Sequence, residues 1–291
     1  MISDQTATKL IRELCINRRG PGNKKVRVID MQRVRFIATR KKIALRDVEI
    51  SCLENDIIPL RYLRNIGTIG LAGQLKLLRS TVAVCGAGGL GGTIIELLAR
   101  QGVGNLVIID KGRFVESNLN RQIMALESNL RRSKVKAAAA RVEKINSATA
   151  VTAINKTINS RNVEKIIKNA GVVLDGLDNL TDRQVVAGAC NKMNIPFVHG
   201  AIAGFSGQLM TIFPGDKGLG AICGSYTDEN GCGVETLTGN PAATAAIIAA
   251  WEVQEAIKII TGIGEPIRNR LLFLDFAGGV FDEIPLAGDG K

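Results

Sequence analysis

The residues best suited to chemistry lie in a glycine-rich turn that follows a short apolar run. The run 82–85 leads into Gly86-Ala-Gly88-Gly89-Leu-Gly91-Gly92, and the spacing predicts a helix over 89–101. Glycines let the backbone approach a ligand, and the N-terminus of a helix presents free N–H groups and a partial positive charge. Gly86, Gly88, Gly89 and Gly91 therefore predict a phosphate-binding turn, although this pattern alone fits any dinucleotide-binding protein.

Charged residues beyond the turn narrow the choice of ligand. The apolar run 105–109 ends in Asp110, where a strand-end carboxylate can bond a ribose hydroxyl. Arg121 and Lys134 then place two cations near the predicted phosphate site, which favours a triphosphate over a nicotinamide dinucleotide. The alternative for both is an ordinary surface cation.

A carboxylate follows a third apolar run. Asp178 comes after the run 171–175, and open α/β sheets bind ligands at such strand ends. A hard oxygen ligand suits Mg²⁺, so we expect Asp178 to hold that metal. Two alternatives stay open: Asp178 could cap a helix that begins near Thr181, or Asp175 could be the metal ligand instead.

The elements that must position these residues alternate along the chain from residue 80 onward. Alternation at this spacing predicts right-handed βαβ crossovers and an α/β fold with a Rossmann-like, mostly parallel sheet. A strand at 207–213 and a hairpin from 271–275 and 279–284 would continue the sheet with antiparallel strands. The predicted elements are strands 81–85, 105–109, 150–156, 171–175 and 196–199, and helices 89–101, 133–146, 160–169, 181–193 and 241–261.

The chain divides near residue 60. Residues 1–60 predict a small, mainly helical N-terminal extension with helices near 6–17, 30–42 and 45–55 and a short strand at 25–29. A helical appendage is favoured there, and a helix-turn-helix is the alternative. Residues 61–291 would form the nucleotide-binding domain, in which the Gly-, Asp- and Asn-rich stretch 215–239 predicts a mobile loop.

The positive charge is unevenly distributed. The chain has a formal net charge of +11, and residues 1–80 hold 17 Lys and Arg against 7 Asp and Glu. A solvated surface is the first interpretation of this basic segment and an acidic protein partner the second, ahead of nucleic acid. The longest charge-free run near the C-terminus, 236–251, is too short to cross a bilayer, and no apolar signal-peptide region opens the chain. We expect a cytoplasmic protein without a membrane partner.

In this order and spacing, the motifs resemble those of the ThiF/MoeB/HesA adenylyltransferases, relatives of the ubiquitin-activating enzymes. The resemblance runs from about Arg61 to Leu286. It includes Arg61-Tyr-Leu-Arg64-Asn65, the glycine turn, Asp110, Asn118-Leu-Asn-Arg121-Gln122, Lys134, Asp178-Asn179, Gly207-Gln208 and the helix that ends in Glu255-Ala-Ile-Lys258.

The resemblance implies roles for particular residues. It makes Arg64, Arg121, Lys134 and Asp178 catalytic, and implies that Arg64 reaches the nucleotide of a second subunit, so that a homodimer is required. ATP and Mg²⁺ are the implied cofactors. The implied nucleotide-binding residues are Gly86, Gly88, Gly89, Gly91, Asp110, Asn118, Arg121, Gln122, Lys134 and Arg183.

The six cysteines form no C-x-x-C pair, whereas many family members hold a structural zinc with two such pairs. We therefore expect no zinc. Cys232 in the long loop is a candidate nucleophile for an activated carboxylate, with an incidental thiol as the alternative. Cys85 and Cys190 are predicted to be core residues, and His199, the single histidine, to have a structural hydrogen-bonding role.

The resemblance implies adenylation of the C-terminal carboxylate of a small ubiquitin-like sulfur carrier of the ThiS/MoaD type, ending in Gly-Gly, before thiocarboxylate formation. The sequence identifies neither the pathway nor the sulfur donor. Two alternatives remain: an NAD(P)-binding Rossmann oxidoreductase, which leaves Arg121, Lys134 and Asp178 without a role, and a non-catalytic nucleotide-binding regulator that uses the basic N-terminal unit.

Overall fold

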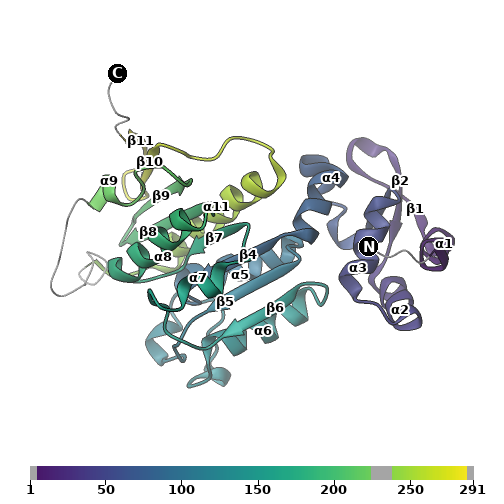
Figure 1. Cartoon of the computed structure of the whole chain (residues 1–291), viewed down its shortest axis with the longest axis horizontal. Coiled ribbons are helices and arrows are strands. Elements are labelled where there is room, and N and C mark those ends of the chain that lie inside the picture. Colours follow the sequence, from purple (N-terminus) through teal and green to yellow (C-terminus); the bar gives the residue numbers. More distant parts are fainter. Residues whose placement is uncertain (1–4, 224–237, 287–291) are drawn as a thin grey trace.

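An eight-stranded sheet organises the chain from residue 81 onward (Figure 1). The computed structural model describes residues 5–223 and 238–286. Five strands pair in parallel and the remaining three continue the sheet with antiparallel pairing, so the predicted fold class is confirmed. The strand order is β11 (Val280–Pro285), β10 (Arg270–Asp275), β9 (Ser206–Ile212), β8 (Phe197–Ala203), β7 (Val172–Asp175), β4 (Thr81–Cys85), β5 (Asn105–Ile109) and β6 (Ala150–Ile154).

Helices cover both faces of this sheet. One face packs against α5 (Gly89–Gln101), α6 (Lys134–Ile145) and α11 (Ala242–Thr261), and the other against α7 (Val163–Ile167) and α8 (Leu180–Lys192). Strand β4 shows why: Val82 and Val84 are buried in the first core, and Ala83 and Cys85 in the second. A strand that is apolar on both faces must be covered on both.

The chain order of the parallel strands creates a crevice. The chain runs from β4 outward through β5 to β6, then crosses back to β7 and β8 on the other side of β4. The connections that leave the carboxyl ends of the paired strands β4 and β7 therefore run to opposite sides, which makes a topological switch point, where open α/β sheets bind ligands.

The N-terminal unit has its own core and its own sheet. A three-stranded sheet in the order β1-β2-β3 packs with three helices around buried Ile11, Ile29, Ile37 and Val48. The short strands β1 and β3 are absent from the sequence-based expectation. The elements are α1 (Gln5–Leu14), β1 (Ile16–Arg19), β2 (Lys25–Ile29), α2 (Met31–Lys41), α3 (Leu45–Glu54) and β3 (Ile57–Pro59).

A further helix, α4 (Ile66–Arg79), connects this unit to the large sheet and also escaped prediction. It packs against α3 and α11, and a short 3-10 turn, Leu60–Tyr62, precedes it. Glycine lowers helix propensity, so Gly67, Gly70 and Gly73 weaken the helical signal of this segment in the sequence. Gly70 has a φ of +66°.

Other boundaries differ modestly from expectation. The predicted helix 160–169 is reduced to α7, and the strand predicted at 196–199 extends through Ala203 to form a hairpin with β9. Of the predicted loop 215–239, residues 224–237 and with them Cys232 lie outside the described residues; α9 (Gly220–Cys223) precedes them. In the described ranges, no helix combines the length and the apolar character needed to cross a membrane.

Candidate functional site

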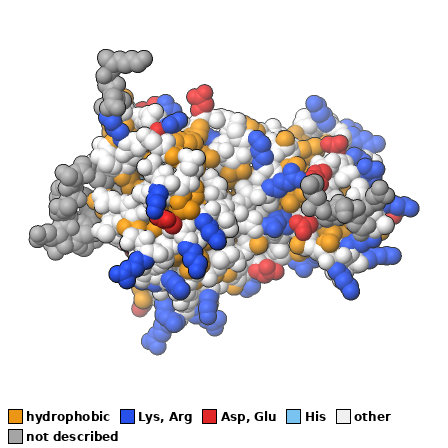
Figure 2. All heavy atoms as spheres, viewed as in Figure 1, with side chains coloured by type: hydrophobic (Ala, Val, Ile, Leu, Met, Phe, Trp, Pro, Cys, Tyr) orange, Lys and Arg blue, Asp and Glu red, His pale blue; other side chains and the backbone are white. Residues whose placement is uncertain are grey.

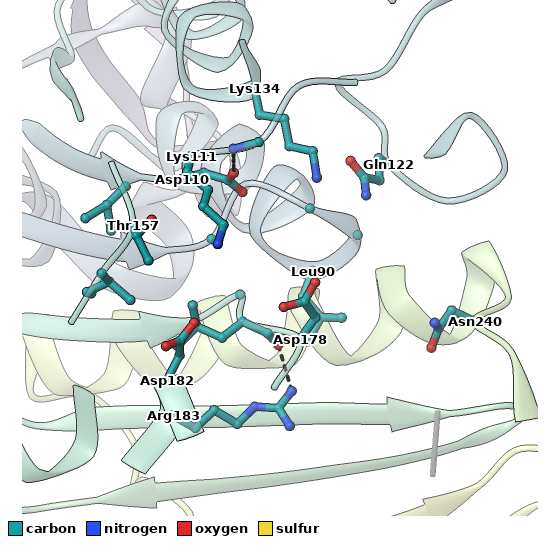
Figure 3. Close-up of a pocket in the computed structure, with 18 of the residues that line it drawn as sticks. Leu90, Asp110, Lys111, Gln122, Lys134, Thr157, Asp178, Asp182, Arg183 and Asn240 are labelled. Carbon is teal, nitrogen blue, oxygen red and sulfur yellow. Dashed lines mark hydrogen bonds between the residues drawn. The ribbon is translucent and has the colours of Figure 1, made fainter. Parts of the chain in front are cut away.

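A pocket opens at the switch point and collects most of the residues singled out from the sequence (Figure 3). The carboxyl ends of β4, β5, β6 and β7 all contribute to it. In Figure 3, Lys134 and Gln122 lie on one side of the pocket and Asp178 and Arg183 on the other. The predicted residues that line it are Gly86, Gly88, Gly89, Asp110, Arg121, Gln122, Lys134, Asp178 and Arg183.

Close backbone contacts explain the glycine turn. Gly86 has a φ of +97°, and a Cβ there would lie 2.2 Å from the Gly176 carbonyl oxygen. A Cβ on Gly91 would lie 2.0 Å from the Gly86 carbonyl oxygen. Gly91 is not among the residues that line the pocket; its lack of a side chain lets α5 pack onto the turn. Gly88 is the N-cap of α5 without a capping side chain, which leaves first-turn N–H groups for a ligand.

Asp110 joins the end of β5 to the glycine turn. Its Oδ2 accepts a hydrogen bond from the Ala87 N–H at 2.8 Å, and its Oδ1 accepts one from the Gly112 N–H at 2.5 Å. An ionised carboxylate has further lone pairs to accept a hydroxyl from a ligand. Asp110 therefore shapes the turn and remains able to bind a ribose.

The cationic side of the pocket is held by a buried asparagine. The Asn118 side chain accepts a hydrogen bond from the Val115 N–H (3.2 Å), and its backbone oxygen accepts one from the Gln122 N–H (2.9 Å). Asn118 itself does not line the pocket, and its hydrogen bonds position the segment that carries Gln122. Gln122, 5% exposed, has a side-chain oxygen without a hydrogen-bond partner among the described residues. Such a buried acceptor fits a polar ligand.

Asp178 is exposed on the pocket wall and is not the helix cap. Asn179 caps α8 instead, since its side chain accepts a hydrogen bond from the Asp182 N–H at 2.8 Å. Both Asp178 and Asp182 line the pocket. No group of three or more His, Cys, Asp or Glu side chains in the described ranges could hold a metal by itself. One or two carboxylates together with phosphate oxygens and water are the usual magnesium donors, so this pair fits Mg²⁺.

Asp175, the alternative metal ligand, does not line the pocket and is bound by other side chains. It is fully buried, with Oδ2 at 2.7 Å from His199 Nδ1 and at 3.1 Å from Arg183 Nε. Its Oδ1 accepts a hydrogen bond from the Leu177 N–H (3.0 Å), and Arg183 donates one to the Leu177 carbonyl (2.7 Å). Leu177, the residue before Asp178, is thus held at both its N–H and its carbonyl group. Asp175 and Arg183 thereby position the loop that carries Asp178.

A buried polar cluster that contains His199 and Glu252 lies behind this loop. Of these two residues, only His199 was considered from the sequence. His199 bonds Asp175 through Nδ1, and its Nε2 lies 3.2 Å from Gln208 Nε2, in keeping with the predicted structural role. Burial is the main cause of the lowered pKa of His199, which therefore stays neutral near pH 7. Glu252 on α11 is fully buried beside Gly200, and burial raises the pKa of its carboxyl well above the usual value.

Among the residues that line the pocket, five with polar side chains were not singled out from the sequence. Lys111 follows β5, and Lys156 and Thr157 follow β6. The strand-end rule that identified Asp110 could have found these three. Asp182, in the first turn of α8, could have been found because it closely follows Asp178 in the sequence. Asn240, just before α11, could not, because a long loop separates it from the other pocket residues.

Arg64 lies apart from the pocket of its own chain. It is exposed, and the described residues offer it no hydrogen bond or ion pair. The structure therefore does not bring Arg64 together with Asp178 in the pocket of one chain. Cys85 and Cys190 are buried core residues, as predicted.

Comparisons with known proteins agree with this geometry. The ThiF family matches residues 62–289. The SAMP-activating enzyme E1 of Haloferax volcanii is 33% identical over 227 residues, which cover 77% of this chain and 84% of that protein. The adenylyltransferase and sulfurtransferase MOCS3-1 of Zea mays is 33% identical over 241 residues, 78% of this chain; the chain spans only 49% of that relative.

Among solved structures, the microcin C7 biosynthetic enzyme MccB in complex with N-formylated MccA is similar in fold. The TM-score is 0.69 at 21% sequence identity, and the match covers 87% of this chain and 83% of that one. At this identity the likeness concerns the fold.

Proposed function

Because the chain belongs to the ThiF family and is an adenylyltransferase of the ThiF/MoeB type, we propose that it adenylates the C-terminal carboxylate of a small ubiquitin-like sulfur carrier. The carrier would be of the ThiS/MoaD type and end in Gly-Gly. The observation that carries the proposal is the pocket itself, in which the carboxylates of Asp110 and Asp178 and the cations of Arg121 and Lys134 meet at one switch point.

The proposed reaction transfers AMP. A carrier carboxylate oxygen attacks the α-phosphorus of ATP, an O–P bond forms, and the bond to the departing pyrophosphate breaks. A carboxylate is already ionised near neutral pH, so the enzyme needs no general base. Its contribution would be to orient the reactants and to stabilise the negative charge on the phosphates.

The pocket residues divide this work. Arg121, Lys134 and Arg183 would stabilise phosphate charge, and Gln122 and the first turn of α5 would bind phosphate oxygens. Asp178, with Asp182 beside it, would hold Mg²⁺, which when bound neutralises phosphate charge. Asp110 would bind the ribose.

The substrate is inferred from the relatives. One is named for activating SAMP, and another combines adenylyltransferase and sulfurtransferase in a chain about twice as long. Sulfur transfer to the adenylate would be a later step, and the sequence does not identify its donor. Cys232 could act at that later step, since adenylate formation needs no thiol.

The active assembly is proposed to be a homodimer. Arg64 is exposed and unpaired among the described residues, yet it lies in the motif that resembles the family's nucleotide-contacting arginine. An exposed position outside the lining of its own pocket leaves Arg64 available to a second subunit.

ATP–pyrophosphate exchange tests the proposal. We expect exchange with a ThiS-type or MoaD-type carrier and none with the same carrier shortened by its last glycine, because that changes the position of the reacting carboxylate. In parallel, MgATP should raise the melting temperature more than NAD(H) does. Stabilisation by NAD(H) alone, with no exchange for either carrier, would favour the dehydrogenase.

A further inference from the structure

We propose that the N-terminal unit positions Arg64 for the nucleotide site of the second subunit, and that Glu49 on α3 is its positioning residue. The inference rests on the dimer proposed above, and it assigns a role in the reaction to a unit that lies outside the nucleotide-binding sheet (Figure 1).

Glu49 links the N-terminal unit to the segment just before Arg64. Its side chain is 1% exposed. One carboxyl oxygen lies 3.4 Å from Arg61 Nε, and the other accepts a hydrogen bond from the Tyr62 hydroxyl at 3.0 Å. Tyr62 is itself fully buried. Burial raises the pKa of Glu49, and the Arg61 charge and the Tyr62 hydrogen bond oppose this rise. A buried carboxyl group that pairs with Arg61 and accepts a hydrogen bond from Tyr62 fixes the positions of both side chains.

The same segment is fixed from the opposite side by the large sheet's helices. Asn146, the C-cap of α6, donates from Nδ2 to the Tyr62 hydroxyl and to the Ala99 carbonyl, both at 2.9 Å. Its side-chain oxygen accepts a hydrogen bond from Arg61. Ala99 lies on α5, the helix that begins at the phosphate-binding turn. The segment 61–62 is therefore held between the N-terminal unit and the nucleotide-binding helix.

The residue after Arg64 is also anchored. Asn65 donates to the Gln74 side-chain oxygen at 2.9 Å, and Gln74 donates to the Gln101 carbonyl at 2.9 Å, at the end of α5. Arg64 is thus the exposed member of an otherwise anchored segment. A long side chain that must reach another subunit loses less conformational entropy if its backbone is already fixed.

Glu49 could alternatively serve only to join the two units within one chain. The two interpretations differ in which subunit's nucleotide site loses affinity for MgATP when Glu49 is replaced. If Glu49 acts through Arg64, its loss damages the partner's site; if it acts only on folding, its loss damages its own chain.

Mixing variants separates these readings. Two variants of Glu49 are used, Glu49→Ala and the nearly isosteric Glu49→Gln. Each is mixed and re-equilibrated with Asp178→Asn in one experiment and with Arg64→Ala in another. Titration calorimetry then counts the high-affinity MgATP sites in each mixture. Alone, Glu49→Ala should weaken MgATP binding by up to ~10²-fold, since a small misplacement of a binding group costs that much. Glu49→Gln should lose less MgATP affinity and respond to mixing in the same way, because Gln can still accept the hydrogen bond from the Tyr62 hydroxyl.

With Asp178→Asn, either Glu49 variant should regain up to about a quarter of the sites, because random pairing makes half of the dimers mixed and each holds one intact site. With Arg64→Ala neither should regain any, because each subunit then fails to supply a well-placed Arg64 to the other, and both sites of a mixed dimer are defective. Glu96→Ala is the matched control: Glu96 is 6% exposed and pairs with Arg100 and Arg141, away from Arg61. It should lower the melting temperature and keep MgATP binding.

Three results would overturn the inference. Normal MgATP binding in both Glu49 variants would remove the role. Failure of Asp178→Asn to rescue them, while it rescues Arg64→Ala, would place Glu49 in its own chain's site and leave the dimer intact. Failure to rescue Arg64→Ala, with subunit exchange shown by native mass spectrometry, would overturn the contribution of Arg64 to the second subunit's site and the inference together.

Discussion

At the scale of single residues, the proposed chemistry depends most on Asp178. Replacing it with Asn removes the charge on the pocket wall, and loss of one such electrostatic contact costs ~10²–10³ in rate. We expect pyrophosphate exchange to fall by that factor in Asp178→Asn. The melting temperature should stay near that of the wild type, because the side chain is exposed and Asn179 caps α8. Near-normal exchange at ordinary Mg²⁺ concentration would exclude the metal role.

Lys134 and Lys136 form a matched pair for the cationic side. Lys134 lines the pocket, whereas Lys136, two residues later on α6, is exposed and does not. Lys134→Ala should weaken MgATP binding about 10-fold or more, since hydrogen bonds to charged groups contribute roughly 1.5–3 kcal/mol. Lys136→Ala should bind as the wild type does. Equal affinities for the two variants, measured by calorimetry, would make Lys134 an ordinary surface cation.

Single residues also show how far sequence reasoning reached. Asp110 and Asp178 line one pocket because each follows a predicted strand, whereas Arg121 and Lys134 were singled out by their place in the order of motifs after the glycine turn. Sequence could not show that Asp175 is buried against His199, since strand-end position alone does not reveal which carboxylate faces solvent.

At the scale of elements, α11 offers a test of the buried cluster. Glu252 and Glu255 are both fully buried on this helix. Neither Glu252 oxygen has a hydrogen bond of good geometry in the described part of the chain. Glu255 accepts hydrogen bonds from Thr211 (2.9 Å) and the Ile267 N–H (2.7 Å) and pairs with Lys258 (2.6 Å).

The two substitutions to Gln should therefore have opposite effects above neutral pH. Glu252 stays protonated in the folded protein while the unfolded chain ionises above pH 4.5. The wild type then loses stability as pH rises, by ~1.4 kcal/mol per pH unit up to the folded-state pKa. Glu252→Gln should remove this loss and be more stabilising at pH 8 than at pH 5. Glu255→Gln should destabilise by about 1–3 kcal/mol. Urea unfolding at both pH values measures this; a pH-independent effect of Glu252→Gln would mean that Glu252 is ionised in the fold.

Elements with strong periodicity could be predicted, and weak ones could not. Strands β4, β5 and β7 are short apolar runs buried on both faces. Strand β1 reads Ile-Asn-Arg-Arg and is stabilised by pairing with β2, and α4 is interrupted by glycines. In both cases tertiary contacts override a weak local signal.

At the scale of the whole molecule, the proposed site is complete only in a dimer. Lys and Arg side chains spread over the N-terminal unit (Figure 2), and Arg64 follows this unit in the chain. We expect a wild-type dimer in analytical ultracentrifugation. Arg64→Ala should keep that mass and lose high-affinity MgATP sites. A monomer with full MgATP affinity would contradict this assembly.

The carrier's fate tests the central claim most directly. ThiS-type and MoaD-type carriers are incubated separately with the enzyme, Mg²⁺ and ATP labelled with ³²P at either the α- or the γ-phosphate, and the protein is separated under acidic conditions that preserve acyl-adenylates. Adenylation predicts that the α-label moves onto the carrier that supports exchange, while the γ-label leaves in pyrophosphate. A carrier blocked by a C-terminal amide should take up neither label. Transfer of the γ-label to a carrier, or of no label to either, would contradict the account.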